Sequence, residues 1–382
     1  MNKERKQFMK TCKPALFAAM TLFAALAIMV QTSAQSQTST FDAAAKSKII
    51  TFDAPGAGTS KGQGTIGAGI NNYWGAIQGS YIDSNNESHG FLRTPDGTFT
   101  TIDPTGSTNT FSEGINVWGA ITGNYVDSSG VSHGFLRAPD GTITSFDDPD
   151  AGTGNGQGTQ TGSNNDFGEI LGNYFDSSGV NHGFLRAPDG TITNFDPKGS
   201  VGTYPDGQAG LNDFGVSNGA YYDSSEVLHG FTRARDGKIT AFDVSGAGKG
   251  PNQGTLCAGI NNFGVVTGFY RDPRNVNHGY VRTPDGKIAT FDVPGAGKGS
   301  GEGTYASDIN DLGAIDGAYI DSSGVWHAFL RAPDGKITRF NVRGAGTASG
   351  QGTQAYANNL EGAISGSYID SNGAYHGFLR TP

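Results

Sequence analysis

The sequence predicts an all-β fold, a single seven-bladed β-propeller with four antiparallel strands in each blade. Three observations lead to this prediction. All seven histidines of the 382-residue chain fall in one repeated motif, at spacings of 44 to 49 residues. Each repeat holds four short segments in which apolar and polar residues alternate, and many of the 61 glycines mark the turns between them. A period near 49 residues with four strands per period is typical of a propeller blade.

One repeat, residues 112–147, shows the expected strands in order. SEGINVWG (112–119) is a first strand that ends in a turn, AITGNYVD (120–127) is a second, VSHGFLRA (131–138) is a third and TITSFD (142–147) is a fourth. Alternation of apolar and polar residues is the period of a half-buried strand. Four such segments joined by short turns form one antiparallel sheet.

Tight turns set the register of these strands. DSSG (127–130) joins the second strand to the third, and APDG (138–141) joins the third to the fourth. Each turn places glycine where the chain needs a positive φ. Asn275 can serve the same purpose in another repeat, because asparagine tolerates this conformation. Glu226 takes the place in DSSE (223–226), and there we expect the turn pattern to break.

The turn lengths place a histidine between a tyrosine and an acid in each repeat. Because Asp127 opposes Val131, Tyr125 opposes His133, and the next turn places His133 opposite Asp147. A buried histidine needs partners for both ring nitrogens, and we expect the tyrosine and the acid to supply them in a structural network. The predicted network comprises His89, His133, His182, His229, His278, His327 and His376; Tyr81, Tyr125, Tyr174, Tyr221, Tyr270, Tyr319 and Tyr368; and Asp53, Asp103, Asp147, Asp196, Asp243 and Asp292, with Asn341 in place of the acid beside His327.

Glycines in the middle of strands are explained by the same register. Phe135 falls opposite Gly123, and Phe146 falls opposite Gly134. An aromatic ring that lies over a glycine fills the space of the missing side chain. We therefore expect these glycines to be packing positions rather than strand breaks.

The two ends of the chain complete each other. The seventh repeat stops at Pro382 after its third strand, whereas KIITFDAPGAG (48–58) matches the fourth strand and linker KIATFDVPGAG (287–297) almost letter for letter. We predict that Ile49–Asp53 pairs with the C-terminal strand, His376–Pro382, and closes a ring. Closure hides strand edges that would otherwise favour aggregation. An open β-solenoid is the alternative, and it would need capping elements that the sequence does not show.

The repeated pattern G-I-N-x-x-G-x-I-x-G-x-Y-x-D-x5-H-G-F-L-R-x-P-D-G-x-I-T-x-F-D resembles the bacterial extracellular repeat family named for its His-Ala-Phe signature, the HAF repeat family. His327-Ala328-Phe329 shows that triplet, and the other copies carry glycine in its middle position. The resemblance covers residues 48–382. It implies export and a repeat fold, and it implies no activity, because members of the family are largely uncharacterised.

Residues 1–34 are predicted to be a secretory signal peptide. Five basic residues precede the apolar run Pro14–Val30, and small residues suited to cleavage follow up to Ala34. An uncleaved membrane anchor is the alternative, although 17 apolar residues are at the short edge for a membrane span. A polar linker (35–47) leads to the repeat domain (48–382). We expect a bacterial protein that is secreted or periplasmic and has no membrane association after cleavage.

The charge of the remaining chain limits its partners. Without the signal peptide the protein carries 21 basic and 34 acidic side chains, a net charge of −13. This charge argues against nucleic acid and anionic membranes as partners. Cys257 is then the single cysteine, so no intrachain disulfide can form, and we expect it to be a small buried side chain. We expect a monomer that binds a polysaccharide or an envelope protein.

No cofactor is predicted, and only Ca²⁺ is left open. The Gly-rich linkers, such as PGAGKGSGEGT (294–304), lack the Gly-Lys-Ser/Thr ending and the helix of a phosphate-binding loop. The Asp-Ser-Ser-Gly turns each offer two or three oxygens. Ca²⁺ takes six to eight, so neighbouring loops would have to supply the rest.

The sequence favours a secreted, non-catalytic binding or scaffold module. Seven near-identical Tyr–His–Asp sets favour a structural role, because an enzyme should break the symmetry at one place. An extracellular enzyme that acts on a glycan at the channel mouth is the alternative, with Glu113 and Glu169 as weak acidic candidates, and a purely structural extracellular protein is a further one. Tyr204, Asp206 and Trp326 depart from the repeat pattern, and we predict that they face a ligand.

Overall fold

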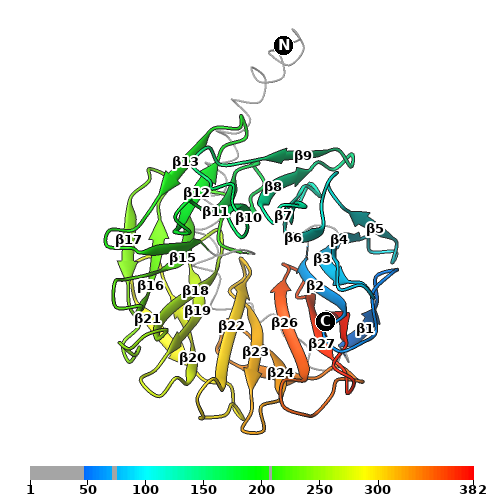
Figure 1. Cartoon of the computed structure of the whole chain (residues 1–382). Helices are drawn as coiled ribbons and strands as arrows, with labels where there is room; N and C mark the ends of the chain where they lie inside the picture. Colours follow the sequence, from blue (N-terminus) through cyan, green and yellow to red (C-terminus); the bar gives the residue numbers. More distant parts are fainter. Residues whose placement is uncertain (1–46, 71–74, 206–208) are drawn as a thin grey trace, which may run out of the picture. The chain divides into compact units, whose positions relative to one another are not determined.

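Figure 1 shows a computed structural model of the chain, which describes residues 47–70, 75–205 and 209–382. In these ranges every regular element is a β strand, from β1 to β28. The all-β prediction is confirmed for these residues. A search of the same residues for a helix long and apolar enough to span a membrane finds none. The predicted signal peptide (1–34) and all but the last residue of the predicted linker (35–47) lie outside the described residues.

The strands repeat in antiparallel units of four that follow the sequence repeats, and we number the units 1 to 7 from β2 onwards. The first strands are β2 (Gly64–Ile70), β6 (Asn109–Ile115), β10 (Gly158–Asn164), β14 (Gly202–Pro205), β18 (Gly254–Ile260), β22 (Gly303–Ile309) and β26 (Gly352–Asn358). The second strands are β3 (Ile77–Ile82), β7 (Ile121–Val126), β11 (Ile170–Phe175), β15 (Ser217–Tyr222), β19 (Val266–Arg271), β23 (Ile315–Ile320) and β27 (Ile364–Ile369). The third strands are β4 (Ser88–Arg93), β8 (Ser132–Arg137), β12 (Asn181–Arg186), β16 (Leu228–Arg233), β20 (Asn277–Arg282), β24 (Trp326–Arg331) and β28 (Tyr375–Thr381). The fourth strands are β5 (Phe99–Ile102), β9 (Ile143–Phe146), β13 (Ile192–Phe195), β17 (Ile239–Phe242), β21 (Ile288–Phe291), β25 (Ile337–Phe340) and β1 (Lys48–Phe52).

The hydrophobic core lies between neighbouring units. In unit 6 the Phe329 ring is fully buried and packs edge-on against Phe291 of unit 5, with ring centroids 6.1 Å apart. Arg331 lies over the same Phe291 ring at 5.0 Å, so its alkyl stem and guanidinium also join the two units. Cys257 is buried, as expected, and its Sγ accepts a hydrogen bond from the Tyr280 hydroxyl.

The mid-strand glycines lie under aromatic rings, as the register predicts. A Cβ atom added to Gly123 would lie 2.6 Å from the Phe135 ring, and one added to Gly134 would lie 3.1 Å from the Phe146 ring. The first distance leaves no room for a side chain, and the second would require the ring to shift. The glycines therefore let each ring lie against the neighbouring strand.

The second-to-third turns have the expected geometry. Gly130 has a φ of 81°, and Asp127 Oδ1 accepts N–H bonds from Ser129 at 2.8 Å and Val131 at 2.9 Å. The expectation that Glu226 breaks the pattern is wrong. Glu226 adopts the same left-handed conformation, with a φ of 61°, because the flanking strands and the aspartate of the turn impose it.

A chain of asparagines joins the turns between first and second strands. Asn116 Nδ2 donates to the Asn165 carbonyl at 3.1 Å, and Asn165 donates to Asn212 in the same way. The series continues through Asn261 and Asn310 to the carbonyl of Asn359, with distances of 2.9–3.1 Å. Each asparagine also caps its own turn through Oδ1; Asn116 Oδ1, for example, accepts hydrogen bonds from the backbone N–H groups of Trp118 and Ala120.

The first and last strands meet in one sheet. β1 pairs antiparallel with β28, with Lys48 opposite Thr381 and Phe52 opposite Gly377. β2 of unit 1 also meets β28, where Gly64 lies opposite Tyr375. Figure 1 shows β1 and β2, in blue, beside the red β27 at the C-terminal end. One central cavity is lined by residues from the first strand, or the turn after it, of every unit.

Candidate functional site

The structure brings the predicted histidine sets together in every unit. Tyr125 pairs with His133 across β7 and β8, and the two rings stack with centroids 5.1 Å apart. His133 Nδ1 lies 2.9 Å from Asp147 Oδ1. The other units repeat this arrangement, with ring centroids 4.8–5.1 Å apart and Nδ1 2.7–3.0 Å from the acid, or from Asn341 beside His327.

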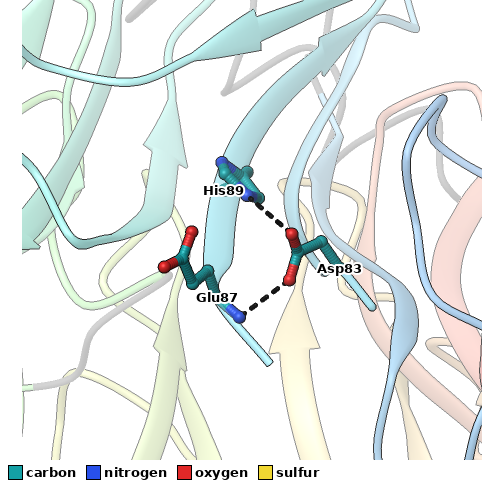
Figure 2. Close-up of side chains that lie close together, drawn as sticks. All are labelled: Asp83, Glu87 and His89. Carbon is teal, nitrogen blue, oxygen red and sulfur yellow. Dashed lines mark hydrogen bonds and ion pairs between the residues drawn. The ribbon is translucent and has the colours of Figure 1, made fainter. Parts of the chain in front are cut away.

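The second histidine nitrogen faces a residue that the sequence analysis missed. The expectation that tyrosine is its hydrogen-bond partner is wrong, because the tyrosine ring stacks on the imidazole instead. Nε2 faces the aspartate that opens the preceding turn. The distance is 3.1 Å from His327 to Asp321 and 3.9 Å from His89 to Asp83, the pair drawn in Figure 2. The aspartate opens the hairpin turn and the histidine follows it on the next strand. The hairpin register could therefore have revealed the contact.

Each turn carboxylate is already held by its own hairpin. Asp127 uses Oδ1 for two backbone N–H groups and turns Oδ2 toward His133. The N–H of Val131, more than His133, keeps the pKa of Asp127 below its ordinary value. Both oxygens therefore work within the turn, which leaves them poorly placed to bind Ca²⁺.

Two carboxylates raise the pKa of the His182 ring. Burial by itself would lower the pKa of His182, but hydrogen bonds and charges from Asp196 and Asp176 outweigh it and raise the pKa above its usual value. The side chain is 24% exposed, so solvent reaches it. Two acids flank this ring, and the same geometry recurs along the chain, with Asn341 in place of one acid beside His327.

In unit 1 a third possible metal ligand, Glu87, lies close to the turn aspartate Asp83 and to His89. Asp83, Glu87 and His89 place one donor atom each within 4.8 Å of one another, which among the described residues is the only such group of three. Figure 2 shows how Asp83 is occupied: it contacts His89 and accepts the backbone N–H of Glu87. Asp83 also accepts two bonds from Asn85. These contacts fill the carboxylate, so the group forms no open cation cage.

The residues predicted to face a ligand have different surroundings. Tyr204 is 42% exposed and packs edge-on against Tyr222, with centroids 5.7 Å apart. Trp326 lines a pocket that does not include Tyr204. Asp206 lies outside the described residues. The structure therefore gives Trp326, and not Tyr204, a place in a concave site.

The Trp326 pocket is aromatic and has a volume of about 300 Å³. Tyr305 contacts two other rings of the lining, with its ring centroid 5.1 Å from Trp326 and 4.9 Å from Phe269 of unit 5. Tyr356 and Gln354 of unit 7 complete the lining. Three units thus contribute aromatic side chains to one half-buried hollow.

Hydrogen bonds hold the two tyrosines of this pocket in place. The Tyr305 hydroxyl accepts from Asn277 Nδ2 at 2.8 Å and donates to the Gly301 carbonyl at 2.6 Å. The Tyr356 hydroxyl lies 3.0 Å from Gln354 Oε1 and 3.1 Å from Ser367 Oγ. Rings fixed in advance lose little freedom when a ligand packs on them.

This pocket breaks the symmetry of the repeats. The positions equivalent to Trp326 carry Ser88, Ser132, Asn181, Leu228, Asn277 and Tyr375, and those equivalent to Phe269 carry Ser80, Asn124, Asn173, Ala220, Ala318 and Ser367. Only units 5 and 6 place an aromatic residue at both positions, because the partner of Tyr375 is Ala318. A position-by-position comparison of the repeats could have revealed these unusual aromatic residues from the sequence.

A second departure from symmetry is a pair of aspartates in unit 6. Asp308 and Asp316 lie opposite each other on β22 and β23. Asn358 of unit 7 donates its N–H to Asp308 Oδ2 at 3.2 Å and its Nδ2 to Asp316 Oδ1 at 2.8 Å. Burial raises the pKa of Asp308 to about 6, and burial together with the charge of Asp308 raises the pKa of Asp316.

The aspartate pair was missed in the sequence because each residue was read within its own repeat. The positions equivalent to Asp308 carry Gly69, Gly114, Ser163, Gly210, Gly259 and Ala357, and those equivalent to Asp316 carry Gln78, Thr122, Leu171, Asn218, Thr267 and Ser365. Unit 6 alone has an acid at both. The earlier candidates are less distinctive: the Glu113 carbonyl accepts from Gln78, and Glu169 Oε2 accepts from Asn165.

The central cavity lies against this pair and has a volume of about 150 Å³. Asp308 lines it, together with Asp166, Asp213 and Asp311 from the turns after first strands. Burial raises the pKa of Asp166, and the nearby charges of Asp213 and Asp311 raise it further. Tyr356 lines both this cavity and the Trp326 pocket, so the two departures from symmetry adjoin.

Comparisons with known proteins bear on the fold. No protein-family model matches the chain, and no curated protein matches it. Among solved structures, a streptogramin B lyase matches with a TM-score of 0.54 at 14% identity, over 88% of this chain and 98% of that one. The BP39L lectin of Burkholderia pseudomallei matches with a TM-score of 0.50 at 12% identity, over 82% of this chain and 98% of that one. At such low identity the likeness is one of fold alone, and that fold is the β-propeller.

Proposed function

We propose that this chain is a closed seven-bladed β-propeller that binds a saccharide in the Trp326 pocket as a non-catalytic module. The observation that carries the proposal is the aromatic wall of Trp326, Tyr305 and Phe269, which the other units lack. Sugar rings present apolar C–H faces that pack on aromatic rings, while their hydroxyls need polar partners at the edge.

The polar atoms around the wall suit hydroxyl groups. Gln354 and Ser307 line the pocket beside the aromatic rings. The Trp326 indole N–H has no hydrogen-bond partner among the described residues, so it is available as a donor. The pocket has no basic side chain among its described lining residues, and the mature chain is acidic. We therefore expect a neutral or amino sugar rather than an acidic one.

Closure of the ring by seven blades is part of the proposal. It is supported by the pairing of β1 with β28 and by the single cavity that all units line. The test is to delete residues 1–53, which exposes the edge of β28, and to add a synthetic peptide of residues 48–56. Restored solubility and melting temperature support closure, whereas an unimpaired deletion variant contradicts it.

The binding test uses a panel of neutral, amino and acidic polysaccharides, with melting temperature as the first readout and calorimetric titration as the second. A ligand that binds only the folded state raises the melting temperature. Trp326→Ala should weaken binding about 10-fold or more, as expected for a central aromatic anchor. Trp118→Ala is the matched control, because Trp118 is 62% exposed and lies outside both pockets.

An extracellular enzyme acting on a glycan is the second candidate, and the Asp308–Asp316 pair favours it. Two interacting carboxyls with raised pKa values are the arrangement that general acid–base chemistry uses. Release of product from a bound polysaccharide would favour the enzyme, provided that Asp308→Asn abolishes this release and retains binding. Binding without turnover in the wild type would choose the module, since fold alone does not decide between them.

Export, the HAF repeat resemblance and the monomeric state complete the proposal. The support for export is the residue pattern of 1–34, and the support for the family is the repeated motif. Cell fractionation and N-terminal sequencing of the exported protein test export, with cleavage after Ala34 expected. Light scattering of the mature chain tests the monomeric state.

A further inference from the structure

Arg271, at the end of β19, differs from the residue at the same place in every other unit. The equivalent positions carry Ile82, Val126, Phe175, Tyr222, Ile320 and Ile369. Phe269, which belongs to the aromatic wall of the Trp326 pocket, lies two residues before Arg271 on the same strand. Side chains two residues apart on a strand project from the same face of the sheet. Arg271 therefore places a positive charge beside the pocket.

The guanidinium of Arg271 is held by two uncharged oxygens. Nη1 donates to the Asn252 carbonyl at 2.6 Å, and Nε donates to Asn277 Oδ1 at 3.3 Å. Within the described ranges no carboxylate forms an ion pair with it, whereas the nearby Arg274 pairs with Asp272 at 3.1 Å. It also lies over no aromatic ring there, unlike six third-strand arginines, which lie 4.5–5.1 Å from a ring centroid. Arginine has five N–H donors, so three remain for a ligand.

Two tyrosine hydroxyls flank this guanidinium. Burial raises the pKa of both Tyr222 and Tyr305, and the positive charge of Arg271 offsets part of that rise. The Tyr222 hydroxyl donates to Asn252 Oδ1 at 3.2 Å, and the Tyr305 hydroxyl accepts from Asn277 Nδ2 at 2.8 Å. The two asparagines that hold Arg271 therefore hold one tyrosine each. Groups fixed in this way lose little freedom when a ligand binds.

These contacts belong to one line of side chains that crosses several units. At one end Tyr204 packs on Tyr222 in unit 4, and at the other end Tyr305 packs on Trp326 in unit 6. These four rings and Arg271 between them are all at least partly exposed. Packed sheets lie about 10 Å apart, so a line across three units spans roughly 20 Å. That length fits a chain of several sugars, with aromatic contacts at both ends and a cation in the middle.

We propose that the ligand of the Trp326 pocket is an acidic polysaccharide in which a neutral sugar alternates with a sugar that carries a carboxylate. This inference rests on the proposed saccharide function and names the ligand class. The neutral sugar packs on Trp326, because the described lining of the pocket has no basic side chain. The carboxylate of a neighbouring sugar binds Arg271, whose planar fork of N–H groups matches the two oxygens of a carboxylate.

The acidic balance of the chain is compatible with this ligand. Net charge acts over a distance, and physiological salt screens exposed charges beyond about 8 Å. Arg271 acts in direct contact, where screening is weaker. Asp272, the acid that follows Arg271 in the sequence, is paired with Arg274 and accepts two backbone N–H groups of its own turn. It therefore leaves the Arg271 guanidinium to the ligand.

The test compares two ligands that differ only in the carboxylate. One is a hyaluronan octasaccharide, in which N-acetylglucosamine alternates with glucuronate, and the other is the same octasaccharide with its carboxylates reduced to primary alcohols. Calorimetric titration of the full chain measures both affinities. We expect hyaluronan to bind about 10-fold more tightly or better, as a hydrogen bond between charged groups would give. Added salt should narrow the difference.

Variants locate the carboxylate site. Arg271→Gln should remove the preference for hyaluronan and leave the affinity for the reduced ligand unchanged, whereas Trp326→Ala should weaken both ligands. Arg274→Gln is the matched control, because it removes an equal charge from the same unit, at a side chain that is 70% exposed and already paired. It should leave both affinities unchanged. Circular dichroism checks that each variant folds.

The outcomes separate this inference from the proposed function. Equal binding of the two ligands by the wild type, or an unchanged preference in Arg271→Gln, would overturn the inference and leave a neutral saccharide as the ligand. An equal loss of hyaluronan binding in Arg274→Gln would also overturn it, since the effect would then be one of overall charge. If no saccharide binds at all, the proposed function fails and this inference fails with it.

Discussion

Asp308 lies opposite Asp316 in unit 6, and the two carboxyls share a single bridging side chain, Asn358. Neither acid has a basic partner among the described residues. Two adjacent carboxyls cannot both ionise without a large cost in a buried site. The pair therefore holds a proton at a pH where exposed aspartates have lost theirs.

The pair should make stability fall with pH. The folded-state pKa of Asp308 is about 6, above an unfolded value of about 3.9, so the folded chain binds the extra proton and loses stability as pH rises through that window. Burial and the charge of Asp308 raise the pKa of Asp316 as well, so the stability of Asp316→Asn relative to the wild type should increase from pH 4 to pH 8. Urea unfolding in EDTA measures this. An equal difference at both pH values, or the same gain in Asp334→Asn, which removes an equal charge from an exposed turn of the same unit, would contradict it.

His182 should contribute in the opposite pH range. Its folded-state pKa is raised by Asp196 and Asp176 against the effect of burial, so its contribution is complete below the unfolded value of about 6.5 and is lost as pH rises through the folded one. The stability gap between wild type and His182→Gln should be larger at pH 6 than at pH 9. The matched background is Asp196→Asn, which neutralises one of the two carboxylates beside His182, and in it the gap should change less. A flat gap for His182→Gln would exclude the charged pair as a source of stability.

The turn at Glu226 carries strain that glycine would remove. Its φ of 61° costs a residue with a Cβ about 1 kcal/mol, so Glu226→Gly should stabilise the chain by about that amount. Gly179 holds the equivalent place in unit 3 with a φ of 79° and open space around a Cβ, so Gly179→Ala should destabilise by a similar amount. Denaturant unfolding compares the two. Changes of the same sign would show that backbone conformation is not the cause.

Asn310 joins unit 6 to unit 7. It accepts N–H bonds from Leu312 and Ala314 in its own turn, and its Nδ2 donates to the Asn359 carbonyl at 2.9 Å. Asn310→Ala should cost about 2–3 kcal/mol, because buried polar groups lose their partners. Asn310→Asp keeps the two bonds within the turn and loses the one between units. Its cost relative to wild type measures the contact between units, and a cost near zero would show that this contact does not hold them together.

Local structure could be predicted from the sequence because its causes are local. Turn residues with positive φ, such as Gly130, and the period-two alternation in segments such as 120–127 determine strand boundaries and register within a few residues. The pairings of Tyr125 with His133 and of Phe135 with Gly123 follow by counting. The prediction at Glu226 was wrong because neighbouring strands can impose a conformation that the residue itself disfavours.

The sequence by itself therefore determined the repeat, the hairpin register and the position of each histidine, since all of these depend on neighbours along the chain. Only the tertiary structure decided which residues of different units meet. The Trp326 pocket takes Phe269, Tyr305 and Tyr356 from units 5, 6 and 7, and the aspartate pair is bridged from unit 7 by Asn358. Such contacts depend on how whole sheets pack side by side, and packing between sheets leaves no fixed spacing in the sequence.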